Sequence, residues 1–173
     1  MEASEGIIMI SLAQEFRRGT VWPTLQKFDM GARSLEAEWL LTGTAIQESR
    51  LKYRKQIGGG PALGLFQMEP DTHHDIWKNY LAHRIDLATR IRREFLDGKF
   101  PCDQDLVDND LYATAMCRVH YMRVPKPIPL YGTYDHNDPR GIAEYWKKYY
   151  NTPLGAGTAE EFIENLEAFK GEA

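Results

Sequence analysis

Residues 42–72 read TGTAIQESRLKYRKQIGGGPALGLFQMEPDT, and this stretch joins an apolar helix end, a glycine-rich loop and a helix start. Apolar residues at helical spacing predict a helix over 32–49. The run Gly58–Pro61 cannot continue that helix, so residues 51–66 are expected to form an irregular loop or a small β-hairpin. The proline that follows suits a first helical turn and predicts the next helix over 70–81.

Outward from this stretch, apolar spacing and capping residues predict further helices over 11–18, 84–96, 109–123, 138–149 and 158–170. Gly19 is expected to end the first of them. Thr158 followed by Glu161 forms a capping box at the start of the last. The expected fold is therefore mainly α, a single domain over 1–173 with about seven helices. The proline-rich segment 125–137 is expected to be a loop within that domain.

The chain has 173 residues, of which 43% are hydrophobic and 27% charged, and its net charge is −4. This composition fits one globular domain. The acidic excess lies in residues 154–173, so the predicted helix over 158–170 is acidic. A protein without bulk positive charge is not expected to bind nucleic acid. The longest uncharged apolar stretch, residues 6–13, is far too short to cross a bilayer, so no membrane insertion is expected.

Cysteine and histidine residues give no expectation of a metal or a cofactor. Cys102 and Cys117 are too few for a disulfide framework, and the apolar surroundings of Cys117 predict a core position. His73 and His74 resemble metal ligands, but adjacent side chains on a helix point about 100° apart. They are therefore not expected to share one ion.

Glu48 is the strongest candidate for chemistry. It lies at the end of an apolar helix, where burial and the negative end of the helix dipole both raise the pKa of a carboxyl group. A raised pKa is what a general acid needs near neutral pH. The positive charges of Arg50 and Lys52 lower the pKa of a nearby carboxyl group, so the sequence leaves the net direction of the pKa shift open. The alternative interpretation is a surface position, because a glutamate in a last helical turn is more often a surface residue.

The loop after Glu48 offers groups that suit a bulky polar ligand. Its glycines allow close approach of the backbone. Gln67 offers an amide, and Phe66 offers a ring face of the kind that stacks on sugars. The alternative interpretation is a structural turn that leads into the next helix.

The order Glu48-Ser49, Gly64-Leu65-Phe66-Gln67-Met68 and Pro70-x-Thr72 resembles the lytic transglycosylases of the soluble type. That family has a Glu-Ser pair, a Gly-Leu-Met-Gln segment and a Pro-x-Thr helix start in the same order. The resemblance covers about 25 residues. It implies a lysozyme-like helical domain whose cleft binds the glycan strands of peptidoglycan.

The resemblance also implies roles for individual residues. Glu48 would protonate the glycosidic oxygen of the MurNAc–GlcNAc β-1,4 bond and then act as the base that closes a 1,6-anhydro ring. Ser49 would orient the glutamate or the substrate. The backbone of Gly64, Leu65 and Phe66, together with Gln67, would line the saccharide subsites.

This chain departs from the family pattern in its third motif, Ala-Tyr-Asn-x-Gly, whose tyrosine reaches the catalytic glutamate. The helix at the expected distance has no Tyr-Asn pair, whereas Tyr150-Asn151 lies much later in the chain. Either the chain carries an insertion, which favours Tyr150, or the partner is another tyrosine, such as Tyr112, Tyr121 or Tyr145.

Glu69 is a second departure, because the family usually has an apolar residue there. A second carboxylate near Glu48 would allow a lysozyme-type hydrolase, whereas a first-turn glutamate that favours the next helix dipole is the simpler interpretation. A third interpretation, supported by the missing motif, is a non-catalytic structural or glycan-binding phage virion protein.

The N-terminal residues lack the basic region of a secretory signal peptide. For a wall-degrading enzyme this predicts delivery in a bacteriophage particle to the host periplasm or cell wall, with the acidic last helix as a docking element for other virion proteins. An effector or plasmid-transfer transglycosylase would share the chemistry and differ in setting.

Overall fold

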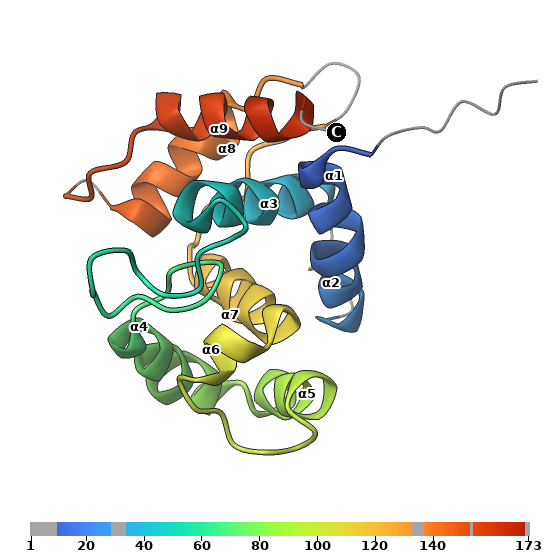
Figure 1. Cartoon of the computed structure of the whole chain (residues 1–173). Helices are drawn as coiled ribbons and strands as arrows, with labels where there is room; N and C mark the ends of the chain where they lie inside the picture. Colours follow the sequence, from blue (N-terminus) through green and yellow to red (C-terminus); the bar gives the residue numbers. More distant parts are fainter. Residues whose placement is uncertain (1–9, 29–33, 133–136, 153, 172–173) are drawn as a thin grey trace, which may run out of the picture.

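The computed structural model describes residues 10–28, 34–132, 137–152 and 154–171, and these are mainly helical (Figure 1). The α-helices are α1 (Leu12–Phe16), α2 (Trp22–Phe28), α3 (Leu35–Ser49), α4 (Pro70–Asp75), α5 (Ile85–Phe95), α6 (Asp105–Asp108), α7 (Asp110–Met122), α8 (Arg140–Trp146) and α9 (Ala159–Gly171). Wide π turns at Arg17–Val21, Ile76–Tyr80 and Lys147–Asn151 extend α1, α4 and α8, and a 3-10 turn follows at Leu81–His83. The predicted mainly α fold is confirmed.

Side-chain caps start several of the helices. Ser34 accepts a hydrogen bond from the backbone N–H of Ala37, and Asn109 caps α7 in the same way. The capping box before α9 is also confirmed, because Thr158 and Glu161 exchange hydrogen bonds of 2.8 and 3.1 Å.

One expectation about the helices is wrong, and one short helix was not expected. Gly19 does not end the first helix, because it lies inside the π turn Arg17–Val21 that continues from α1 into α2. Glycine weakens a helix without forbidding it, and here neighbouring turns continue on both sides. The short helix α6 was not predicted, because four residues are too few for apolar periodicity to be visible.

Residues 51–69 form the irregular loop that the glycines predict. Its only bridges between described residues pair Leu63 with Lys55 and with Met68. Two positions, one in this loop and one in α3, need glycine for close packing. A Cβ on Gly64, which has a φ of +72°, would lie 2.0 Å from the carbonyl oxygen of Leu106, and a Cβ on Gly43 would lie 2.2 Å from the Phe162 ring.

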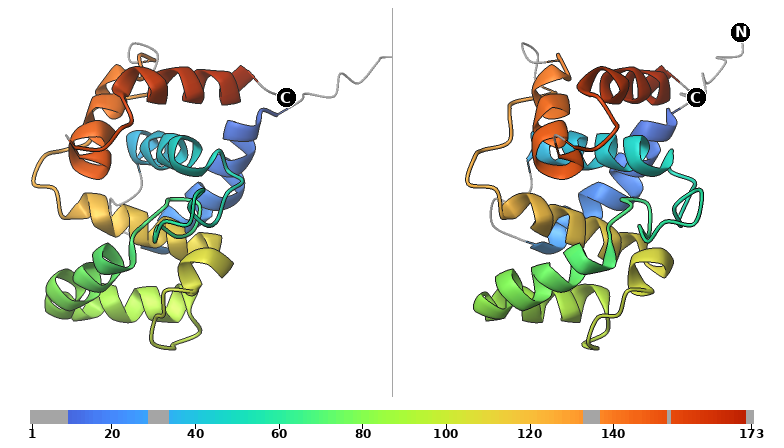
Figure 2. Two further views of the ribbon diagram at one scale, coloured as in Figure 1. Left: turned by 60° about the vertical axis from the view of Figure 1, so that its left-hand side comes forward. Right: turned by 90° about the vertical axis from the view of Figure 1, so that its left-hand side faces the viewer.

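Two hydrophobic clusters form the core, and α7 contributes to both. The first cluster joins α1, α2, α3, α8 and α9 and includes Val21, Leu25, Leu40, Ile46, Tyr121, Trp146 and Phe162. The second joins α4, α5 and α6 and includes Met68, Ile76, Leu81, Ile91, Leu106, Met116 and Val119. In Figure 2, α8 and α9 lie on one side of the molecule, α4 and α5 lie on the other, and α3 and α7 run between them. The predicted core position of Cys117 is confirmed.

The part of the proline-rich loop that is described, residues 125–132, is held against α8. The hydroxyl of Tyr145 donates a 2.8 Å hydrogen bond to the carbonyl oxygen of Lys126. Residues 133–136 of the predicted loop and residues 1–9 lie outside the described part of the chain. Among the described residues, no helix combines the length and apolar character that a membrane span needs.

Candidate active site

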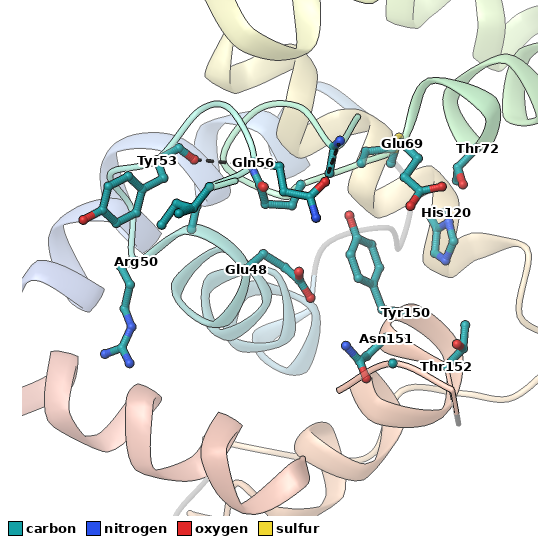
Figure 3. A pocket seen from close by; sticks show the side chains of 16 residues that line it. Glu48, Arg50, Tyr53, Gln56, Glu69, Thr72, His120, Tyr150, Asn151 and Thr152 are labelled. Carbon is teal, nitrogen blue, oxygen red and sulfur yellow. Dashed lines mark hydrogen bonds between the residues drawn. The ribbon is translucent and has the colours of Figure 1, made fainter. Parts of the chain in front are cut away.

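A groove of about 930 Å³ opens beside the C-terminal end of α3 (Figure 3). Its lining comes from five segments: the end of α3, the loop that follows, the start of α4, the C-terminal part of α7, and the π turn after α8 with the residues that follow it. The lining residues are Glu48, Ser49, Arg50, Tyr53, Gln56, Ile57, Ala62, Gln67, Met68, Glu69, Thr72, His120, Tyr150, Asn151, Thr152 and Gly155. Because both hydrophobic clusters supply parts of the wall, the groove depends on the packing of the whole chain.

Glu48 has the electrostatic property expected of a general acid. Burial raises the pKa of its carboxyl group from 4.5 to about 7, and the indole N–H of Trp146 limits the rise by donating a 2.9 Å hydrogen bond to Oε1. Burial penalises the charged carboxylate, whereas the indole N–H stabilises it. The group therefore changes its protonation state near neutral pH.

The local backbone explains why Glu48 faces the groove. The helix ends one residue later, at Ser49, and Arg50 and Leu51 then adopt positive φ values of 55° and 54° and turn the chain away from the α3 axis. Ser49 is buried, and its hydroxyl donates a 2.9 Å hydrogen bond to the carbonyl oxygen of Ala45. That hydrogen bond occupies the hydroxyl proton, so Ser49 contributes to the helix end.

Residues 64–67 divide between the core and the groove. Leu65 and Phe66 are buried with 2% and 1% of their surface exposed, so the Phe66 ring is not available to stack on a sugar, and that prediction is wrong. Gln67, which has a positive φ of 46°, lines the groove, and its side-chain amide donates a 2.9 Å hydrogen bond to the carbonyl oxygen of Gly64. Gly64 itself is enclosed against α6 and does not line the groove.

Tyr150, the tyrosine that an insertion would favour, lies in the groove wall. Its hydroxyl does not bond to Glu48, which is the partner that the family motif implies. It donates a 2.7 Å hydrogen bond to the carbonyl oxygen of Phe66 and so joins the π turn after α8 to the loop. Its one proton is therefore not directed at Glu48, and the N–H donor to the glutamate is Trp146 instead.

The other candidate tyrosines lie elsewhere. Tyr112 is buried with its hydroxyl 2.6 Å from His73 Nε2. The hydroxyl of Tyr121 forms a hydrogen bond with the hydroxyl of Thr44 inside the core. Tyr145 bonds the loop after α7. None of these three lines the groove, so Tyr150 is the one of the four candidate tyrosines that shares it with Glu48.

Glu69 and His120 occupy the part of the groove beyond Tyr150 in the view of Figure 3. Glu69 is exposed at the N-terminal cap of α4, where its side chain makes no capping hydrogen bond. His120 donates from Nε2 to the carbonyl oxygen of Tyr149 at 2.9 Å, which leaves Nδ1 as a hydrogen-bond acceptor. Nδ1 is buried and has no partner among the described residues, and burial lowers the pKa of the ring.

Sequence reasoning missed Trp146 and His120 as members of this site. Trp146 belongs to an aromatic run in which the individual roles are not distinguishable from spacing, because Tyr145, Tyr149 and Tyr150 share its helix. A single histidine in an apolar helix gives still less signal. A buried tryptophan whose ring carries one N–H needs an acceptor, and this need was the one available hint.

The two adjacent histidines depart from the expectation based on their divergent directions. His73 uses Nδ1 and His74 uses Nε2, and both reach the carboxylate of Asp103, at 2.8 and 3.0 Å. Each imidazole ring has two nitrogens, so two histidine side chains that point apart on a helix can still reach the same carboxylate. Two other carboxyl groups of the same helix have different surroundings. Asp71 is exposed, and Asp75 pairs with Arg123 at 2.6 Å.

Comparisons with protein-family models, with curated proteins and with solved structures found no match to this chain.

Proposed function

We propose that this protein is a peptidoglycan lytic transglycosylase that cleaves the MurNAc–GlcNAc β-1,4 bond, with Glu48 as its single acid and base. One observation carries the proposal: a carboxyl group whose burial raises its pKa to about 7 lines a groove that can hold part of a glycan strand. Ligand sites commonly measure about 300–1,000 Å³, and this groove lies at the upper end.

In the proposed reaction Glu48 first acts as an acid. Its proton moves to the glycosidic oxygen as the C1–O4 bond breaks, and positive charge develops on the sugar ring. The carboxylate then accepts the proton of the C6 hydroxyl while O6 attacks C1, and the new C1–O6 bond closes the 1,6-anhydro ring. Glu48 ends the cycle protonated, so one carboxyl group with a pKa near the working pH serves both steps.

Trp146 has a definite part in this scheme. Its indole N–H stabilises the carboxylate that exists between the two steps, and its hydrogen bond fixes the orientation of Oε1. The other oxygen of Glu48 is then the one left to reach the glycosidic oxygen. Tyr150 contributes by joining the two walls of the groove through the Phe66 carbonyl oxygen.

A lysozyme-type hydrolase of the same bond is the second candidate, and the position of Glu69 favours it. This carboxyl group lines the same groove as Glu48, and a hydrolase of this kind needs a second carboxyl group in the groove as general base for an attacking water. The two reactions differ in product: the transglycosylase leaves anhydro ends, and the hydrolase leaves reducing ends.

The test treats purified peptidoglycan with the wild type, Glu48→Gln and Glu69→Gln and identifies the soluble muropeptides by mass spectrometry. We expect anhydro products from the wild type and from Glu69→Gln, and a loss of at least about 100-fold in Glu48→Gln. Glu164→Gln is the matched control, because Glu164 is exposed on α9 outside the groove.

Equal release by the wild type and Glu48→Gln would reject the proposal. Reducing ends that disappear in Glu69→Gln would replace it with the hydrolase. Release of no product by the folded wild type would favour a binding or structural role for the groove.

A further inference from the structure

The side chains of His73, His74 and Asp103 meet outside the groove, at a separate pocket. His73 Nδ1 lies 2.8 Å from Asp103 Oδ1, and His74 Nε2 lies 2.9 Å from the same oxygen. One nitrogen of each ring and one carboxylate oxygen lie within 4.8 Å of one another. Two chain segments about thirty residues apart therefore direct three donor atoms at one point.

These donors are of the types that a zinc ion uses. Imidazole nitrogen and carboxylate oxygen bind Zn²⁺ at about 2.0–2.2 Å, and three protein ligands with one open position are a common arrangement. Donor atoms that are already close together need only small side-chain movements to surround an ion at those distances. His74 and Asp103 are partly exposed, with 62% and 33% of their side-chain surface accessible, so an ion can enter from solvent.

The second nitrogen of His73 has the support that a ligand histidine needs. His73 is buried, and its Nε2 lies 2.6 Å from the hydroxyl of Tyr112. The indole N–H of Trp77 donates to that same hydroxyl at 2.9 Å. When Nδ1 binds a metal ion, Nε2 carries the ring proton and donates it to the Tyr112 oxygen, which fixes the ring orientation.

A pocket of about 360 Å³ lies directly against the three ligands, and its lining includes Trp77, Pro101 and Cys102. This space leaves room for a water molecule at a fourth coordination position. The exposed thiol of Cys102 lines the same pocket and is the competing ligand that any experiment has to separate from the histidines.

We propose that His73 Nδ1, His74 Nε2 and the Asp103 carboxylate form a zinc site that joins α4 to the turn before α6. The site has a consequence for the groove, because Glu69, the N-cap of α4, and Thr72 lie in the groove wall and the helix continues into His73 and His74. A bound ion would hold the last turn of α4 to Asp103 and so stabilise one wall of the groove. The proposal does not depend on the reaction that the groove performs.

The test is a zinc titration of the full chain, prepared without a histidine tag and freed of metal with a chelator that is then removed. Isothermal titration calorimetry with zinc chloride is expected to give one ion per chain. His74→Ala and Asp103→Asn are expected to weaken binding by at least about tenfold. His83→Ala is the matched control, because His83 is an exposed histidine outside the cluster, and it should bind as the wild type does.

A second measurement separates binding at this site from damage to the fold. Circular dichroism should show that His74→Ala keeps the helical content of the wild type, because His74 is exposed. Zinc at about 100 times Kd should raise the Tm of the wild type and His83→Ala by about 5–10 °C. The same zinc concentration should leave the Tm of His74→Ala and Asp103→Asn nearly unchanged.

Three results would overturn the proposal. The first is the absence of stoichiometric zinc binding by the folded wild type, which would leave the three side chains as a hydrogen-bonded ion-pair network. The second is unchanged affinity in both His74→Ala and Asp103→Asn. The third is zinc binding that persists in those variants and disappears in Cys102→Ser, which would assign the ion to the thiol.

Discussion

Glu48 combines a chemical advantage with a cost in stability. Burial raises the pKa of its carboxyl group to about 7 in the folded chain, whereas the unfolded chain exposes it at about 4.5. Between these two pH values the unfolded chain releases the proton first. The folded state therefore becomes less stable relative to the unfolded state as the pH rises through this window.

Replacing Glu48 with glutamine should remove this pH dependence. The wild type and Glu48→Gln are expected to have similar free energies of unfolding near pH 4, where the carboxyl group is protonated in both states. Above pH 7 the variant should be more stable, by up to about 3 kcal/mol. Urea denaturation between pH 4 and pH 8 measures the difference, and Glu164→Gln should follow the wild type. Parallel curves for the wild type and Glu48→Gln would show that the carboxyl group is not buried as described.

At the level of single residues, the sequence predicted some positions well and others not at all. Glu48 was identifiable because helix end, apolar neighbours and a glycine-rich loop coincide there. Phe66 was misassigned, because the choice of which residues of an irregular loop turn inward depends on long-range packing. His73 and His74 were discounted because adjacent side chains on a helix point about 100° apart, and their common partner, Asp103, was not considered because it is about thirty residues away in the sequence.

Among the elements, the loop over residues 51–69 depends on one glycine more than on the others. Gly64 and Gly58 both have positive φ, at 72° and 88°, so both substitutions to alanine strain the backbone. They differ in their surroundings. A Cβ on Gly64 meets the backbone carbonyl of Leu106 at 2.0 Å, whereas a Cβ on Gly58 has nothing within 4 Å.

This contrast gives a matched pair of substitutions. Gly58→Ala should cost about 1 kcal/mol, the strain of a left-handed backbone alone. Gly64→Ala should lower the free energy of unfolding by about 3 kcal/mol or more, because the backbone of either the loop or α6 has to move. Equilibrium denaturation in urea measures both. Equal losses would mean that the loop moves freely away from α6.

Helices were the elements that the sequence predicted most reliably, because their signals are local. Asn109 and Thr158 cap helices where the pattern of caps and apolar residues indicated, whereas Ser34, which caps α3, was not singled out. The π turns were not predictable in this way. A π turn adds a residue to a helical turn but uses the same types of residue as an α-helix. The spacing of apolar residues therefore does not predict where it occurs. The turn Lys147–Asn151 determines where Tyr150 lies, and this part of the site was open until the fold was known.

In the molecule as a whole, α9 completes the first hydrophobic cluster. The acidic helix that the charge distribution predicts buries Phe162, Leu166 and Phe169 and packs on α3 and α8. The Phe162 ring lies directly against Gly43 of α3, so the two helices approach closely. The contribution of α9 to packing is therefore visible in the structure, whereas docking to a virion protein stays a prediction.

Phe162→Ala should destabilise the chain by about 3–5 kcal/mol, because it leaves a cavity that the glycine opposite cannot fill. The free energy of unfolding in urea gives the measurement. Leu154→Ala is the control, since Leu154 is 99% exposed and its truncation should change the stability by less than about 0.5 kcal/mol. A loss below about 1 kcal/mol in Phe162→Ala would indicate that α9 is not an integral part of the core.

The position of α7 limits how the groove can change shape. One face of this helix packs in the first cluster, another packs in the second, and His120 from the same helix lines the groove. A hinge motion between the two clusters would have to bend α7 itself. Any change in the shape of the groove is therefore expected at its rim, where Ile57 is 74% exposed beside the glycines of the loop.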